Sequence, residues 1–151
     1  MNQIRSIVFR QIDQVREQSE KLFVYRESRL FRRLVNQRRV IRFLESQGFL
    51  SIDITNWSLE SRIQLYSSCS HIVYEYGAGG ANNYFALDGV NVLELRHPGN
   101  RHSVEQFGYV RVSQANWKFV VGKRANLIQR LLLGSDAWSI SIRELKKSMI
   151  F

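Results

Sequence analysis

Four short apolar runs, separated by segments with helical spacing, dominate the first two thirds of the chain. The runs lie at residues 21–25, 49–54, 70–75 and 91–95, and their length and their content of Val, Ile, Phe and Tyr are typical of buried strands. A glycine-rich turn follows the third run, and a short helix is expected to begin near Ala81. We therefore predict four strands in a regular order.

Apolar positions at helical spacing precede and separate these runs. An amphipathic helix is predicted at the N-terminus, a second helix is expected to end near Gly48, and Ser58 is expected to cap a third. The apolar faces of the three helices are, in turn, Ile4, Ile7, Val8, Ile12 and Val15; Leu34, Val40, Ile41 and Leu44; and Leu59, Ile63 and Tyr66.

Strands that alternate with helices imply right-handed crossovers and parallel pairing. The predicted fold class is therefore α/β, a Rossmann-like parallel sheet with helices on both faces. Later in the chain we expect a polar loop at 97–102, strands at 109–113 and 118–122, and a helix at 127–133. A last helix is expected to begin at Ser141, where Glu144 completes a capping box. No repeat or linker divides the sequence. Residues 1–151 are thus expected to form one domain, with an N-terminal helix over 1–20, a core over 21–95 and further strands and helices over 96–151.

Charge adds the next constraint. The 22 lysines and arginines outnumber the 13 acidic residues and give a net charge of +9, which attracts polyanions, acidic lipid surfaces or phosphorylated ligands. Arginines crowd the segment from 26 to 42, and planar guanidinium groups suit bidentate phosphate recognition. A solvated helix face is the alternative interpretation of most of them, whereas Arg26 directly ends a predicted strand.

The single cysteine, Cys69, excludes an internal disulfide and is typical of a protein kept in a reducing compartment. We therefore expect a cytoplasmic location, and the basic charge leaves peripheral contact with a membrane open. No run of about 18 or more apolar residues is present. Nucleic-acid binding would suit the charge, but the chain lacks a recognisable helix-turn-helix, zinc finger or RNA-stacking motif, so no nucleic-acid partner is expected.

Candidate ligand groups follow three of the predicted strands, and open parallel sheets bind ligands outside the carboxyl ends of their strands. Arg26 follows the first strand, and a loop from His97 to His102 follows the fourth. After the third strand, a turn with Gly77, Gly79 and Gly80 leads into a helix whose free N–H groups suit an anion and whose first turn holds Asn82 and Asn83. Plain structure is an equal alternative for such a turn.

Two carboxylates in apolar surroundings need an explanation. Glu94 lies inside an apolar strand, where a buried carboxylate requires a partner. A salt bridge to an arginine of the 26–42 segment and hydrogen bonds to ribose hydroxyls are the two alternatives. Glu75 is similar but nearer to its strand end. His71, His97 and His102 lack the close helical spacing of a zinc-binding pair, so no metal site is predicted.

Taken in order, the motifs of residues 21–95 resemble glycosyltransferase family 61, and the resemblance covers about half of the chain. The motifs are VYRESRLFRRLVNQ, GF, LESRIQLYSSCSHIVYEYGAGGANNYF and NVLEL. The resemblance implies nucleotide-sugar contacts at the matching positions, while Tyr25, Gln37 and Tyr76 depart from the family's serine, glutamate and histidine. The matching positions are Arg26, Arg33, Asn36, Gly77, Ala78, Gly79, Asn82 and Glu94.

The resemblance also implies an activity. It indicates the C-terminal, donor-binding half of a GT-B enzyme that inverts at the anomeric carbon, needs no metal or separate cofactor, and passes a sugar from a nucleotide-sugar donor to a glycan or polysaccharide acceptor. An N-terminal half or separate subunit would help to bind the acceptor. Arginines and the glycine turn would neutralise the leaving diphosphate.

The general base is left open between candidates. His102, Glu75 and Asp88 are the residues considered on this chain, and a base on the N-terminal half is an equal alternative. A nucleotide-sugar-binding module without turnover is the alternative function, and a basic nucleic-acid binder is a third.

Overall fold

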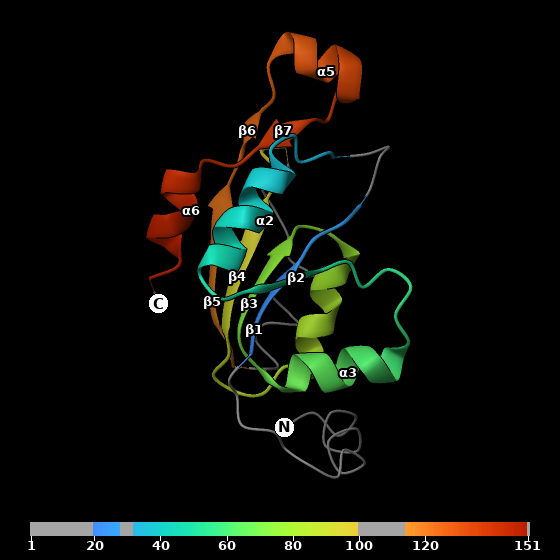
Figure 1. Ribbon diagram of the computed structural model, residues 1–151, viewed down its shortest axis with the longest axis vertical. Coiled ribbons are helices and arrows are strands. Elements are labelled where there is room, and N and C mark those ends of the chain that lie inside the picture. The colour runs from blue at the N-terminus through green and yellow to red at the C-terminus, as the bar shows by residue number, and fades with distance from the viewer. Residues whose placement is uncertain (1–19, 28–31, 100–113, 151) are drawn as a thin grey trace.

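Five parallel strands form the central sheet in the computed structural model, which describes residues 20–27, 32–99 and 114–150 (Figure 1). The strands lie in the order β2-β1-β3-β4-β5, and all four neighbouring pairs are parallel. The predicted α/β class with a parallel sheet is therefore confirmed. The strands are β1 (Glu20–Val24), β2 (Leu50–Ile52), β3 (Cys69–Glu75), β4 (Asn91–Arg96) and β5 (Asn116–Val121).

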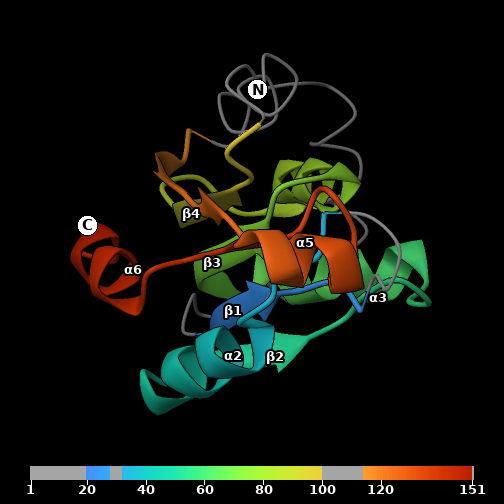
Figure 2. The same ribbon diagram turned by 90° about the horizontal axis from the view of Figure 1, so that it is seen from above.

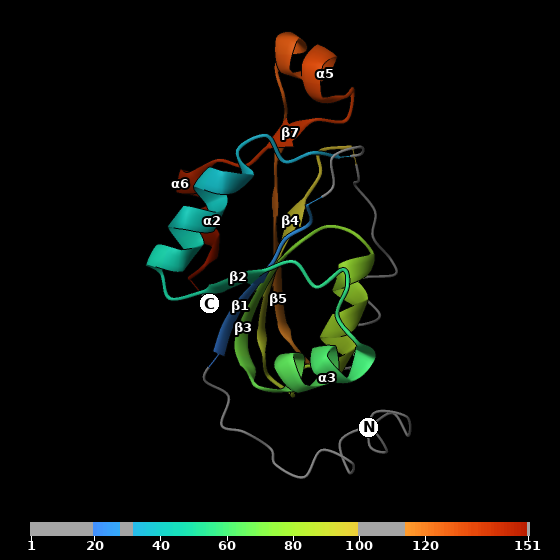
Figure 3. The same cartoon turned by 45° about the vertical axis from the view of Figure 1, so that its right-hand side comes forward.

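Helices cover both faces of this sheet (Figure 3). On one face lie α2 (Gln37–Ser46) and α6 (Ile142–Ser148), and on the other lie α3 (Leu59–Ser67) and the 3-10 helix η1 (Ala78–Phe85). Successive side chains of a strand point to opposite faces, so the sheet has two cores. Phe23, Val73 and Leu93 pack with α2 and α6, whereas Leu22, Ile72 and Val92 pack on the side of α3. Burial on both faces explains the nearly continuous apolar runs in the sequence.

Capping groups set the helix boundaries that the sequence indicates. The Ser58 hydroxyl accepts a hydrogen bond from the Ser61 N–H at the start of α3, and Ser141 does the same for Glu144 at the start of α6. Gly48, with φ of +83°, ends α2 in a Schellman motif: its N–H bonds the Glu45 carbonyl while the next N–H bonds the Leu44 carbonyl.

Two details of the helix predictions are wrong. Leu34 does not lie on a helix face, because it forms a parallel bridge with Trp138, between a bend at Arg32 and a turn at residues 35–36, before α2 begins at Gln37. The helix after the glycine turn begins at Ala78 rather than near Ala81, and it is a 3-10 helix. In the first case a contact with a distant part of the chain overrides the local pattern.

A hairpin-like extension lies between β5 and α6. Strands β6 (Lys123–Arg124) and β7 (Trp138–Ser139) pair antiparallel, and helix α5 (Leu127–Leu133) connects them. Figure 1 shows α5 projecting beyond the end of the sheet, and Figure 2, viewed from that end, shows it in front of the strands. The strand expected at 118–122 and the helix at 127–133 are confirmed as β5 and α5.

Some predictions cannot be compared with the fold. The expected strand at 109–113 and His102 lie outside the described residues. So do residues 1–19 of the expected N-terminal helix, while Glu20 begins β1. The single-domain organisation stays a prediction. In the described part of the chain, no helix has both the length and the apolar character that crossing a membrane requires.

Candidate functional site

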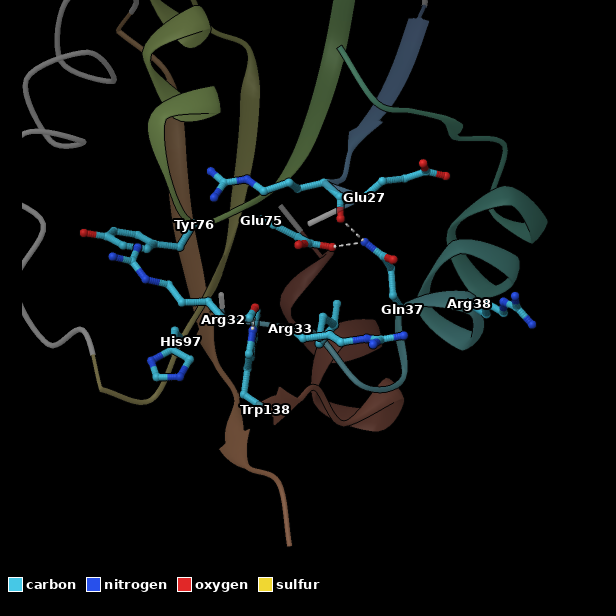
Figure 4. Close-up of a pocket in the computed structure, with 11 residues that line it drawn as sticks. Glu27, Arg32, Arg33, Gln37, Arg38, Glu75, Tyr76, His97 and Trp138 are labelled. Carbon is cyan, nitrogen blue, oxygen red and sulfur yellow. Dashed lines mark hydrogen bonds between the residues drawn. The ribbon is translucent and has the colours of Figure 1, made fainter. Parts of the chain in front are cut away.

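A pocket of about 240 Å³ opens where β1 and β3 end (Figure 4). Arg26 follows β1, Glu75 ends β3, His97 follows β4, and Trp138 reaches the same pocket from β7. In the strand order 2-1-3-4-5 the connection from β1 leads to β2 on one side, whereas the connection from β2 leads back across β1 to β3 on the other side. This reversal makes the gap between β1 and β3 a topological switch point. Ligands of open α/β sheets bind at such points. The pocket thus lies at the edge of the sheet that the sequence indicates.

Arginine dominates the lining of this pocket. Its two carboxylates belong to Glu27 and Glu75. Over the described ranges the single ion pair joins Glu94 to Arg96, which do not line the pocket, so no carboxylate there pairs directly with a pocket arginine. The pocket is therefore cationic and suited to an anion. Its four arginines are Arg26, Arg32, Arg33 and Arg38.

The N-terminus of α2 strengthens this positive potential. Gln37, Arg38 and Arg39 form its first turn, which contains no acidic residue. The aligned peptide dipoles already place partial positive charge at this end, so each arginine there is unfavourable by roughly 0.3–1 kcal/mol. An anion bound at the pocket offsets this repulsion, which favours a phosphorylated or carboxylated ligand.

Arg26 and the glycine turn meet directly. Gly77 has φ of +149°, and a Cβ built on it would stand 2.3 Å from Nη2 of Arg26. The absence of a side chain at position 77 therefore makes room for the guanidinium group. The structure thus brings together two groups that the sequence nominated separately.

Gln37 joins the two strand ends. Its side-chain amide donates to the Arg26 carbonyl oxygen at 2.8 Å and to Oε1 of Glu75 at 2.9 Å. Burial raises the pKa of Glu75 to about 7, although the Gln37 hydrogen bond and the Arg26 charge act in the opposite direction. A carboxyl group with this pKa changes its protonation in the range where general bases work.

His97 and Trp138 form one wall of the pocket. The N–H of Gly99 donates to Nδ1 of His97 at 3.0 Å, so Nε2 carries the proton and donates to the Asp136 carbonyl at 3.1 Å. Burial lowers the pKa of His97, although the hydrogen bond to the Asp136 carbonyl and the Asp136 charge act in the opposite direction. The ring lies edge-on to Trp138, with centroids 5.9 Å apart, and Trp138 Nε1 donates to the Arg32 carbonyl at 2.7 Å.

The side chain of Asn36 holds the C-terminal segment in place. Its Nδ2 donates to the Ile140 carbonyl at 2.7 Å, and the Ile140 N–H donates to its Oδ1 at 3.1 Å. Backbone bonds between Trp138 and both Arg33 and Val35 continue this pairing. Asn36 does not line the pocket. Instead it fixes the segment that carries Trp138 into the pocket.

Two more of the predicted ligand-binding residues, Asn82 and Glu94, form hydrogen bonds with other groups of the protein. Asn82 Nδ2 donates to the Gly79 carbonyl at 2.9 Å. Glu94 is fully buried, accepts from Nε and Nη2 of Arg96 at 2.9 and 3.1 Å, and accepts from the Tyr74 hydroxyl at 3.1 Å. Its arginine partner thus lies on the same strand and not in the 26–42 segment. Neither Asn82 nor Glu94 lines the pocket.

Asp88 lies far from the pocket by topology. It is exposed in the turn before β4, at the end of the sheet where the parallel strands begin, whereas the pocket lies where they end. The structure therefore does not bring Asp88 to the pocket as a base. Among the bases considered on this chain, Glu75 is the described residue that lines it.

Comparison with known proteins adds the decisive observation. The family model described as Glycosyltransferase 61 matches residues 1–93. The chain belongs to glycosyltransferase family 61. A search of curated proteins found no match. The family match confirms the resemblance over residues 21–93 and extends it to the N-terminus of the chain, whereas Glu94 and Leu95 lie just beyond the match.

The matched region of this family 61 chain contains most of the pocket. Arg26, Gln37 and Glu75 lie inside the match, whereas His97 and Trp138 lie beyond it. Sequence reasoning did not assign Gln37 or Trp138 to the pocket. The available signal for Gln37 was its position at a helix start beside the motif arginines, but no local signal points to Trp138, which arrives through a distant backbone pairing.

Proposed function

We propose that this chain binds the diphosphate of a nucleotide-sugar donor in the Arg26 pocket and transfers the sugar to a glycan or polysaccharide acceptor. Family membership supports glycosyltransferase function in general. The observation that carries the donor proposal is the group of four pocket arginines at the β1/β3 switch point, where no described carboxylate pairs directly with them. We further propose a GT-B arrangement in which another half or subunit contributes to acceptor binding.

The proposed chemistry is a single displacement with inversion. The acceptor hydroxyl attacks the anomeric carbon as the bond to the nucleoside diphosphate breaks, and negative charge grows on the departing phosphate. Preorganised positive groups stabilise such charge as it develops. Arg26, Arg33 and the N-terminus of α2 supply it, so we propose transfer without an essential metal or separate cofactor.

Glu75 is the proposed general base among the described residues. It lines the pocket, and burial raises its pKa to about 7. In its ionised form it accepts the proton that the acceptor hydroxyl loses on attack. Gln37, which donates to Glu75 Oε1, orients the carboxylate and ties it to the Arg26 backbone. A base on the acceptor-binding half or at His102 is the alternative.

A nucleotide-sugar-binding module without turnover is the second candidate. It is favoured by Asn36, Asn82 and Glu94, whose side chains bond the protein's own groups although the family resemblance assigns them to the ligand. Release of free sugar from the donor, followed by NMR, separates the two functions. Turnover that disappears in Glu75→Gln supports the transferase, and saturable binding without turnover supports the module.

Calorimetric titration with UDP, GDP and CMP at moderate salt tests donor binding. We expect saturable binding of one nucleotide, weakened at least about tenfold by Arg26→Ala, because a hydrogen bond to a charged group contributes roughly 1.5–3 kcal/mol. Arg42→Ala is the matched control, since Arg42 is exposed on α2 and does not line the pocket. Equal weakening in both variants, or no binding of any nucleotide, contradicts the proposal. Weak binding of all three that falls steeply with salt indicates a general polyanion site instead.

A further inference from the structure

Helix α5 turns its apolar side to solvent. Its exposed side chains are Leu127, Ile128, Leu131 and Leu132, with exposed fractions of 68%, 69%, 77% and 77%. Positions i, i+1, i+4 and i+5 share one face of a helix, so these side chains form a continuous apolar face. Figures 1 and 3 show that α5 lies at the tip of the extension, away from the helices that cover the sheet.

The opposite side of α5 carries Gln129, Arg130 and the half-buried Leu133, and its two polar residues bond within the extension. Gln129 completes a capping box with Asn126, and Nε of Arg130 donates to the Ser135 carbonyl at 3.2 Å. A surface helix of a globular protein normally buries its apolar stripe and exposes its polar one. In α5 the four apolar side chains of one face are exposed and only Leu133 is half-buried, so burial inside the chain's own core does not explain the exposed face.

The size of the leucine face argues against a second copy of the chain as its partner. A helix of seven residues is about 10 Å long. Two such faces packed together cover much less than the roughly 1,200 Å² at the lower end of stable protein interfaces. Insertion into a bilayer needs no complementary partner surface, because apolar side chains enter the boundary of the acyl chains to a depth of about 5–10 Å.

The charges around α5 complement an anionic surface. Lys123 and Arg124 are exposed on β6, and Arg130 lies on α5 itself. Asp136 is the one acidic residue between positions 122 and 137 of the sequence. Basic residues beside an apolar helix face add electrostatic attraction to acidic lipids.

We propose that α5 docks this protein on the surface of an anionic bilayer, with the leucine face inserted and Lys123 and Arg124 at the lipid headgroups. Trp138, on the strand that returns from α5, lines the arginine pocket. Docking therefore places the pocket next to the membrane surface. The proposal rests on the exposure and charge of the extension and does not depend on what the pocket binds.

Flotation of the full chain with phosphatidylcholine vesicles, with and without phosphatidylglycerol, tests this proposal. We expect binding to vesicles that contain phosphatidylglycerol. The double variant Leu131→Gln/Leu132→Gln should lower the apparent affinity for these vesicles at least about tenfold, since two leucine side chains no longer move from water into the bilayer. Lys123→Gln/Arg124→Gln should reduce the preference for the acidic lipid. Leu59→Gln is the matched control, because Leu59 is 60% exposed on α3, at the opposite end of the molecule (Figure 1).

Several results would overturn the proposal. These are no flotation of the unaltered chain, equal losses in the α5 and Leu59 variants, and a dimer in light scattering that the α5 variant converts to monomers. The last result would show that a second copy covers the helix. Thermal unfolding and nucleotide titration of the α5 variant should match the unaltered chain, which separates failure of docking from failure of the donor site.

Discussion

The guanidinium group of Arg26 occupies the space that a side chain at Gly77 would fill. The two residues follow neighbouring strands, and a Cβ at position 77 would stand 2.3 Å from Nη2 of Arg26. Atoms of this kind do not approach so closely, so any substitution at Gly77 must move the arginine or the turn. The glycine thereby controls the position of the positive charge at the β1/β3 switch point.

Gly77→Ala should therefore weaken nucleotide binding at least about tenfold by displacing Arg26, while strain at φ +149° costs about 1–2 kcal/mol of unfolding free energy. Calorimetry and urea unfolding measure the two effects. Gly89→Ala is the control: Gly89 has φ of +81° but nothing within 4 Å of its built Cβ, so this variant pays for backbone strain alone. Full affinity in Gly77→Ala would show that Arg26 does not hold the nucleotide.

Glu75→Gln should change how stability depends on pH. The folded chain holds the Glu75 proton up to a pKa of about 7, against an ordinary value of 4.5. Between these values the folded state binds more protons than the unfolded state, so this group's contribution to stability falls as pH rises. Glutamine does not ionise, so the variant does not lose this stability as the pH rises. It should be more stable than the unaltered chain at pH 8 by up to roughly 3 kcal/mol, with little difference near pH 4.

Urea unfolding of both proteins from pH 4 to pH 8 measures this difference. The unaltered chain alone is not informative, because His97 has a lowered pKa and acts with the opposite sign: its contribution is lost as the pH falls. Comparing Glu75→Gln with the unaltered chain at each pH cancels that contribution. A difference that stays constant from pH 4 to pH 8 would mean that the Glu75 pKa is not raised.

Asn36→Ala should lower the stability of the fold more than it lowers the affinity for the nucleotide. The substitution leaves the N–H and carbonyl of Ile140 without the side chain that binds both, which costs about 2–3 kcal/mol. Asn116→Ala, at an exposed position on β5, should cost less than about 1 kcal/mol. Loss of nucleotide binding with unchanged urea stability would assign Asn36 to the ligand instead.

Glu94→Gln should be among the most destabilising isosteric substitutions in the sheet. It removes the carboxylate that pairs with Arg96, whose side chain is 7% exposed, and breaking a buried pair costs about 3–5 kcal/mol. Replacing both residues, as Glu94→Leu with Arg96→Met, should cost less, because the buried arginine charge is removed together with its carboxylate. If the double variant is less stable in urea than Glu94→Gln, the ion pair stabilises the fold by more than the desolvation of its charges costs.

Local patterns predicted the regular elements well. The strand at 70–75 and the helix capped by Ser58 needed only short-range information, because alternation, periodicity and capping act within a few residues. Leu34 was misplaced because its conformation depends on Trp138, which pairs with it from the C-terminal segment. The β6/β7 pair was missed for a related reason, since strands of two residues carry little periodic signal.

The candidate site was predicted in outline but not in its contacts. Arg26, Arg33 and Glu75 were nominated because they end strands or match a motif, and all three line the pocket. The sequence could not separate them from Glu94, since both glutamates occupy apolar strands. The direction in which each side chain points decides the difference: Glu94 meets Arg96 and Tyr74 inside the protein, whereas Glu75 reaches the pocket and Gln37.

The sequence by itself determined the parallel α/β sheet, the edge of the sheet at which the pocket opens and membership of family 61. These follow from periodicity, from glycine and capping signals, and from ordered motifs, all of which are local properties of the chain. Only the tertiary structure decided which groups share the pocket, that Gln37 bridges Arg26 and Glu75, and that Trp138 closes one wall. Those contacts join residues far apart in sequence, so they depend on strand order and packing that no local pattern records.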